Sequence, residues 1–206
     1  MHRGNPINTR AVRIGILSCT ICAVAGCVVP SSTIRLVDYL ESGEHQTLGE
    51  TFPECYYSVD GFGNIDVVLR RIQPARDDPR ASIRQVVHIR TVWRSIPGKT
   101  TAERTQINGL IRYHIDSPSG RALLEGAGSV FLYPNEKNDR LTGGVDFAIL
   151  RPTIKQGDTA DIFHNVELSA RFRATRDPRR TVRIANDLER WFATSPLAQA
   201  GQPMGR

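Results

Sequence analysis

The chain has 206 residues, of which 40% are hydrophobic and 23% charged, so it is long enough and apolar enough for one packed domain. Its formal net charge is +6, but three arginines lie in the first 13 residues, which contain no acid. Without them, 24 basic residues face 21 acidic ones, a net charge of +3. So mild a balance gives no electrostatic reason to bind a polyanion, and it argues against nucleic acid as a partner.

The N-terminal segment has the parts of an export signal. Residues 1–13 are basic, and the following run from Ile14 to Val29 is almost wholly apolar or small. This run stops at Pro30, short of the roughly 20 residues that a membrane-spanning helix needs. We therefore expect the protein to be exported, with residues 1–26 as its signal peptide.

The end of this signal, Val24-Ala25-Gly26-Cys27, resembles the lipobox of bacterial lipoproteins, in which an aliphatic residue and two small residues precede a cysteine. The resemblance covers only about the first 27 residues. It implies cleavage before Cys27 and a diacylglyceryl thioether on its sulfur. Two or three acyl chains anchor a protein stably to a membrane. In a diderm bacterium, Val28 after the cysteine would imply transit to the outer membrane.

A second cleavage rule fits the same stretch. Ala23-Val24-Ala25 is a small-residue site for an ordinary signal peptidase, and a cut there would release a soluble, secreted protein with a free Cys27. A disulfide between Cys27 and Cys55 would then be expected. If Cys27 is lipidated instead, Cys55 should be buried and reduced, or should pair with another chain.

Beyond residue 34 the dominant pattern is alternation of apolar and polar residues, which is typical of strands with one buried and one solvated face. Within 107–116, for example, Ile111 and Tyr113 fall on one face, and Arg112 and His114 on the other. The apolar positions of the two clearest runs are Ile83, Val87, Ile89 and Trp93, and then Ile107, Ile111, Tyr113 and Ile115. The six runs are 65–72, 83–94, 107–116, 122–133, 144–151 and 161–175, and Phe172 faces inward in the last of them.

These runs are separated by segments rich in Pro, Gly, Asn and Asp, which favour turns. About seven strands at regular spacing predict a mainly β protein, an antiparallel β-sandwich within a domain over 34–193. The strands are long and a helix follows them, so a lipocalin-like β-barrel is the alternative. Residues 27–33 are expected to hold the lipidated cysteine and a short tether.

One predicted helix closes the domain over residues 178–193. Asp177 is placed to be its N-cap and Pro178 its first residue. Val182, Ala185 and Leu188, together with Phe192, recur at helical spacing, and Ile184 and Trp191 flank them. The tail 194–206 is predicted to be disordered.

A catalytic interpretation rests on His114 and Asp116, which share a strand face and could act as a base and its orienting carboxylate. His88 and His164 could join His114 around a metal, but three histidines on separate strands have no metal-binding spacing. The same residues also fit an ordinary solvated face. No nucleophile motif accompanies them, and we predict no metal and no cofactor.

The most distinctive chemical feature of the body is a cluster of arginines on the last strand and the helix. One interpretation is a solvated face compensated by Asp177, Asp187 and Glu189; the other is a patch for anionic lipid headgroups or cell-wall polymers. The cluster comprises Arg171, Arg173, Arg176, Arg179, Arg180 and Arg183.

Two glycines mark a different kind of position. Gly126 and Gly128 fall on the same face of the run 122–133. Glycines two residues apart in a strand relieve crowding where the strand bends or another element crosses it. We therefore predict crowding at this point, from a bend of the strand or from a crossing element.

Taken together, these features predict an exported, membrane-anchored envelope lipoprotein on the outer membrane or periplasmic face. Its body would be a non-enzymatic binding or structural module, whose partner the sequence does not identify. The alternatives are a lipocalin-like carrier of an apolar ligand, and an envelope hydrolase or metal-dependent enzyme using His114 and Asp116.

Overall fold

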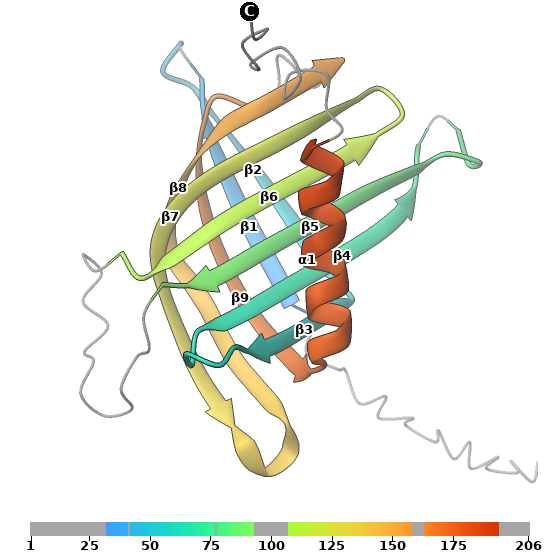
Figure 1. The fold of residues 1–206 in the computed structure, drawn as a ribbon. Helices are drawn as coiled ribbons and strands as arrows, with labels where there is room; N and C mark the ends of the chain where they lie inside the picture. Colours follow the sequence, from blue (N-terminus) through green and yellow to red (C-terminus); the bar gives the residue numbers. More distant parts are fainter. Residues whose placement is uncertain (1–31, 41, 77, 93–106, 158–162, 194–206) are drawn as a thin grey trace, which may run out of the picture.

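The computed structural model describes residues 32–40, 42–76, 78–92, 107–157 and 163–193. In this part of the chain, nine strands precede one C-terminal helix, α1 (Figure 1). A short 3-10 turn, Glu136–Asn138, joins β7 to β8. The elements are β1 (Ser32–Tyr39), β2 (His45–Phe52), β3 (Glu54–Val59), β4 (Ile65–Pro74), β5 (Ser82–Thr91), β6 (Gly109–Ser117), β7 (Gly120–Asn135), β8 (Arg140–Gly157), β9 (Asn165–Arg176) and α1 (Pro178–Ala193).

The strands form one sheet that closes into a barrel. From β3 to β9 each strand pairs antiparallel with the next, and a short parallel pairing of Tyr56 and Tyr57 with Thr175 and Arg176 joins β9 back to β3. The rest of this edge of β9 pairs with β1, which carries β2. The result is a ring of seven strands with two additional strands.

The mainly β prediction with a C-terminal helix is confirmed, but the predicted sandwich is wrong and the barrel alternative describes the architecture. The two architectures share the same sequence signal, because each buries one face of every strand. What separates them is β7 and β8, which are 16 and 18 residues long and curve around the molecule. Strands of this length bring β9 back to β3 and leave no second layer.

The predicted alternation holds along the middle strands. Val87, Ile89, Ile111 and Tyr113 are fully buried or nearly so, and they point into the barrel. Phe172 also faces the interior, as its register predicted. The predictions for Trp93 and the tail 194–206 concern positions outside the described residues. Ile107 departs from the pattern, because it lies before the first residue of β6 and is 66% exposed.

The barrel begins earlier than the sequence pattern indicated. Ser32 and Thr33, which we assigned to the tether, belong to β1 and pair with Phe52 and Thr51. Ser32 is 3% exposed, so it belongs to the folded body. The rest of the predicted tether, 27–31, lies outside the described residues.

The helix has the predicted bounds and the predicted cap. The backbone N–H of Arg180 donates a hydrogen bond to Oδ1 of Asp177 at 2.9 Å, which satisfies a free donor of the first turn. Its buried face differs from the prediction, because Thr181, Ile184 and Leu188 are buried while Val182 is 51% exposed. Ile184 and Leu188 form an apolar cluster with Val68 and Val86, on the outer face of β4 and β5.

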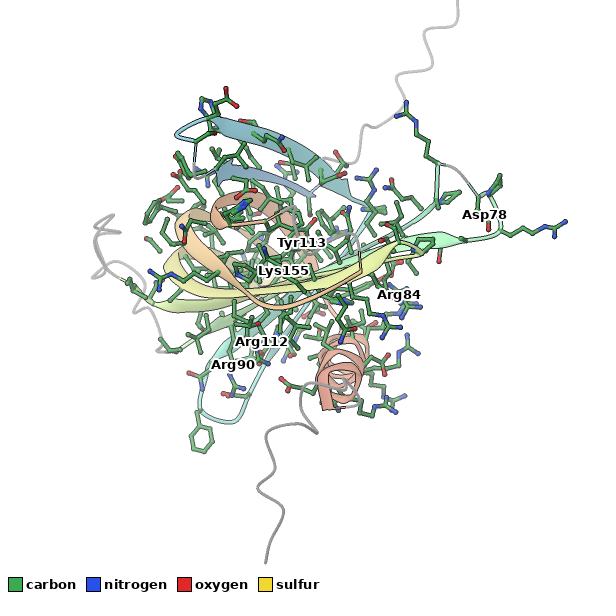
Figure 2. The ribbon with its side chains drawn as sticks, turned by 90° about the horizontal axis from the view of Figure 1, so that it is seen from above. Asp78, Arg84, Arg90, Arg112, Tyr113 and Lys155 are labelled. Atoms are coloured by element: carbon green, nitrogen blue, oxygen red, sulfur yellow. The ribbon has the colours of Figure 1, made fainter. Side chains whose placement is uncertain are left out.

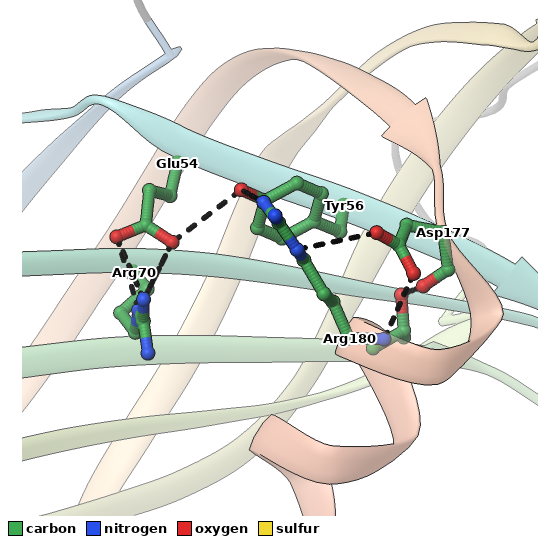
Figure 3. A network of polar contacts seen from close by, with 6 residues as sticks. Glu54, Tyr56, Arg70, Asp177 and Arg180 are labelled. Carbon is green, nitrogen blue, oxygen red and sulfur yellow. Dashed lines mark hydrogen bonds and ion pairs between the residues drawn. The ribbon is translucent and has the colours of Figure 1, made fainter.

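A chain of polar contacts fixes the start of the helix to β3 (Figure 3). The guanidinium of Arg180 lies over the ring of Tyr56, 5.1 Å from its centroid, and donates to the hydroxyl at 2.5 Å. That hydroxyl is 3.5 Å from a carboxylate oxygen of Glu54, which also pairs with Arg70 of β4 at 2.7 Å. The helix is therefore positioned over the outside of the barrel by both apolar and charged contacts.

Candidate functional site

The predicted lipidation site, Cys27, lies outside the described residues. The nearest described position is Ser32, whose hydroxyl oxygen accepts a hydrogen bond from the backbone N–H of Arg173 at 3.3 Å. The chain therefore joins the barrel beside the C-terminal half of β9. The start of β1 and the start of α1 lie at the same end of the barrel (Figure 1).

Three of the six clustered arginines are engaged in ion pairs. Arg171 is 2.9 Å from Asp146 and lies over the ring of Phe131, 4.6 Å from its centroid. The other two pairs are Arg176 with Asp139 at 3.5 Å and Arg180 with Asp177 at 3.3 Å. Exposed ion pairs of this kind stabilise a protein only weakly, but they compensate the positive charge of these three side chains.

The other three arginines are exposed. Arg173 lies on the outer face of β9, while Arg179 and Arg183 lie on the solvent face of α1. The two helical arginines border a shallow, open hollow, which is lined by Pro178, Arg179, Val182, Arg183, Asn186 and Arg190. The predicted cluster is therefore divided, and its exposed part combines positive charge with the apolar side chain of Val182.

The residues of the alternative, catalytic interpretation have other neighbours in the structure. His114 and Asp116 share the outer face of β6, but Asp116 pairs with Arg121 at 3.2 Å. His88 pairs with Asp66 at 2.8 Å, and His164 lies beside Asp38 of β1 at 3.6 Å. Among the described residues, no group of three or more His, Cys, Asp or Glu is arranged to hold a metal ion.

The environment of His114 also differs from the solvated face that its alternation predicted. It is 2% exposed on the outer wall of the barrel, where Val86 and Leu123 are its cross-strand neighbours. Burial lowers the pKa of the imidazole to about 3, with smaller contributions from the positive charges of Arg84 and Arg121. The side chain is therefore neutral at physiological pH.

Sequence reasoning missed a set of polar residues that face the barrel interior. Arg71, Gln85, Ile115, Ala122 and Lys155 are successive cross-strand partners on β4 to β8, so they form one layer around this wall. We call Arg71, Gln85 and Lys155 the polar layer. The available signal was Gln85 itself, a polar residue at an inward position between Ile83 and Val87.

The next layer toward the centre of the barrel contains Tyr113, whose cross-strand partners are Val87 and Leu124. Seen from above, Tyr113 and Lys155 lie on the interior side of the wall, whereas Arg84 and Arg112 lie on the side of the helix (Figure 2). Burial raises the pKa of the Tyr113 hydroxyl, and the positive charge of Arg71 opposes that rise. The polar layer and Tyr113 therefore form a second candidate site.

The thiol of Cys55 is free and buried in the barrel core. Burial raises its pKa to about 12, and a hydrogen bond with Ser32 opposes that shift. Because the thiolate is the reactive form, we expect native alkylation by N-ethylmaleimide at pH 7 to be roughly a thousandfold slower than in urea. Mass spectrometry of timed samples measures both rates; similar rates would contradict the buried placement.

No helix in the described residues is long and apolar enough to cross a membrane. Comparison with protein-family models, with curated proteins and with solved structures finds no match for this chain.

Proposed function

We propose that the protein is an exported, lipid-anchored envelope protein, whose non-enzymatic barrel lies on an anionic membrane through the exposed arginines at the start of α1. The observation that carries this proposal is the position of Ser32. It contacts Arg173 on β9, and β9 continues through Arg176 into the helix that bears Arg179 and Arg183.

The length of the tether keeps this end of the barrel near the bilayer. Four residues separate Cys27 from Ser32, and an extended chain spans at most about 3.6 Å per residue, so Ser32 would lie within roughly 18 Å of the acylated cysteine. Electrostatic attraction to anionic lipids acts over about 10 Å at ordinary ionic strength. Arg179 and Arg183 are exposed, and they follow Arg173, the residue that contacts Ser32, by six and ten residues in the chain.

The state of Cys55 supports acylation of Cys27. A disulfide between the two residues was the expectation for the alternative cleavage after Ala25. Cys55 instead lies in the apolar core with 8% exposure, beside the hydroxyl of Ser32. Drawing a partner cysteine to this sulfur would require opening the packed start of β1.

The anchor is tested by the mature N-terminus. We expect mass spectrometry of the protein from a diderm host to find an acylated Cys27 as the first residue, and fractionation to place it with membranes. Cys27→Ser should abolish acylation, whereas Cys55→Ser should leave it intact. An unmodified N-terminus at Gly26 would contradict the proposal.

The arginine surface is tested without the anchor, on a chain that begins at Val28. We expect Arg179→Glu with Arg183→Glu to reduce binding to phosphatidylglycerol vesicles about tenfold or more, since each basic residue contributes about 1 kcal/mol near such a surface. The matched control is Arg76→Glu with Arg80→Glu, which makes the same charge change in the exposed turn between β4 and β5. Co-sedimentation measures the binding, and an equal loss in both double variants would refute a specific surface.

A second candidate function is favoured by the closure of the sheet. A barrel presents an interior with two ends, which suits a carrier of a small ligand better than two packed layers do. A ligand site inside the barrel must use the interior side chains, and among the described residues the polar layer brings three polar side chains together there.

A further inference from the structure

The side chains in the barrel interior change from apolar to polar along the barrel axis. Val67, Ile89 and Ile111 form an apolar layer, and Leu69, Val87, Tyr113 and Leu124 form the next. The third layer contains Arg71, Gln85 and Lys155 together with Ile115 and Ala122. Apolar packing therefore gives way to polar side chains within two layers.

Two buried polar atoms at this boundary have no hydrogen-bond partner among the described residues: the hydroxyl of Tyr113 and the side-chain oxygen of Gln85. Tyr113 is fully buried and Gln85 is 5% exposed, so bulk water does not compensate them. An unsatisfied buried polar group is costly, and natural proteins rarely keep one without a bound partner. A hydroxyl can donate a hydrogen bond and an amide oxygen accepts one. Together they match a ligand group that both accepts and donates hydrogen bonds.

The charge of Arg71 is already matched within the protein. Arg71 forms an ion pair with Glu50 of β2 and donates a hydrogen bond to Gln73. Lys155 also has an interaction partner within the chain. A charged ligand would bring an additional charge into this partly buried layer, where an unpaired charge is strongly unfavourable. The layer therefore selects an uncharged headgroup.

The layer next to Tyr113 contains a small side chain and reaches solvent at one end. Ala122 occupies its position on β7, and Gly120 precedes it by two residues at the start of this strand. The side chain of Arg71 is 24% exposed, so the layer reaches solvent at this end of the barrel. Ile115 is the cross-strand partner of Gln85, and Ile83 lies two residues before Gln85 on the same face of β5, so both are apolar neighbours of Gln85.

From these observations we infer that Tyr113 and Gln85 bind the uncharged amide or hydroxyl headgroup of a small amphiphile, whose apolar body packs against Ile83 and Ile115. This inference refines the carrier function, and it does not depend on the lipid anchor. Either proposal can be refuted without the other, because acylation of Cys27 and binding of a ligand in the barrel are measured by different experiments.

The test uses the mature protein with isotope-labelled isoleucine methyl groups, in bilayer nanodiscs if Cys27 is acylated and in solution if it is not. We expect hexanamide and 1-hexanol to shift the methyl signals of Ile83 and Ile115 saturably. Hexanoate and hexylammonium, which have the same chain length and a full charge, should bind at least tenfold more weakly. Absence of a saturable shift with every probe would overturn the inference, as would equally tight binding of the charged probes.

Two variants separate ligand binding from folding. Tyr113→Phe removes a hydroxyl without a partner among the described residues, so it should leave the thermal midpoint unchanged or raise it, while weakening hexanamide binding about tenfold. Tyr57→Phe is the control, since Tyr57 is a buried tyrosine of β3 that lies outside the layers of Tyr113 and Gln85. A large destabilisation by Tyr113→Phe with unchanged hexanamide binding would assign the hydroxyl a structural role and refute the site.

Discussion

Acidification from pH 7 to pH 4 is expected to destabilise the barrel, and His114→Gln is expected to remove a large part of that loss. His114 is 2% exposed, and burial together with Arg84 and Arg121 lowers its pKa to about 3. In the unfolded chain the imidazole has the ordinary value of 6.5. Below pH 6.5 the unfolded state binds a proton that the folded state accepts only near pH 3, so stability is full above 6.5 and falls on acidification.

The size of the effect follows from this window. The slope is at most about 1.4 kcal/mol per pH unit, so the histidine accounts for roughly 2–3 kcal/mol between pH 6.5 and pH 4. Urea unfolding followed by circular dichroism at both pH values measures the difference. His45→Gln, in the exposed part of β2, is the matched control and should keep the wild-type pH dependence. Parallel losses in wild type and His114→Gln would contradict the buried, neutral histidine.

His114 also shows where sequence reasoning stopped. Alternation along 107–116 placed its side chain on the outer face of β6 correctly, since Ile111 and Tyr113 face the interior. The error was to equate the outer face with solvent. The amphipathic pattern of residues 178–193 predicted a helix that packs on the sheet, but nothing local in the sequence says which part of the barrel it covers.

The boundaries that local chemistry controls were predictable. Asp177 and Pro178 define the start of α1 because a capping carboxylate and a fixed φ act within one turn. Closure of the sheet depends instead on a parallel contact between β3 and β9, more than 110 residues apart in the chain. A pattern of buried and solvated faces is the same with or without that contact, so the sequence supported sandwich and barrel alike.

The candidate ligand site was missed for a related reason. Arg71, Gln85 and Lys155 occupy inward positions of three different strands, and only the register between these strands brings them into one layer. Within each strand, the alternation shows only a single polar residue at an inward position. The arginine cluster was the opposite case: it was conspicuous in the sequence, yet Arg171, Arg176 and Arg180 have acidic partners close by.

The second large effect is expected at Gly126, where the backbone of β8 causes the crowding that the glycines predicted. A Cβ at this position would lie 1.8 Å from the carbonyl oxygen of Ile149 in β8, and backbone cannot move aside as a side chain does. β7 and β8 curve strongly here, with a register shift between Ser129 and Val130. Gly126→Ala should therefore destabilise the protein by about 3 kcal/mol or more, or prevent folding.

A graded series keeps this prediction testable even if Gly126→Ala does not fold. At Gly109 the nearest atom to a Cβ is a side-chain methyl of Val130, at 2.3 Å, which can shift, so Gly109→Ala should lose less stability than Gly126→Ala. At Gly49 of β2 there is nothing within 4 Å, and alanine should change stability by no more than about 1 kcal/mol, with a gain possible because it restricts the unfolded chain. Urea unfolding of the three variants should give this order. Equal effects at Gly126 and Gly49 would contradict the prediction, because they would show that the close approach of the β8 backbone at Gly126 does not limit the side chain that this position accepts.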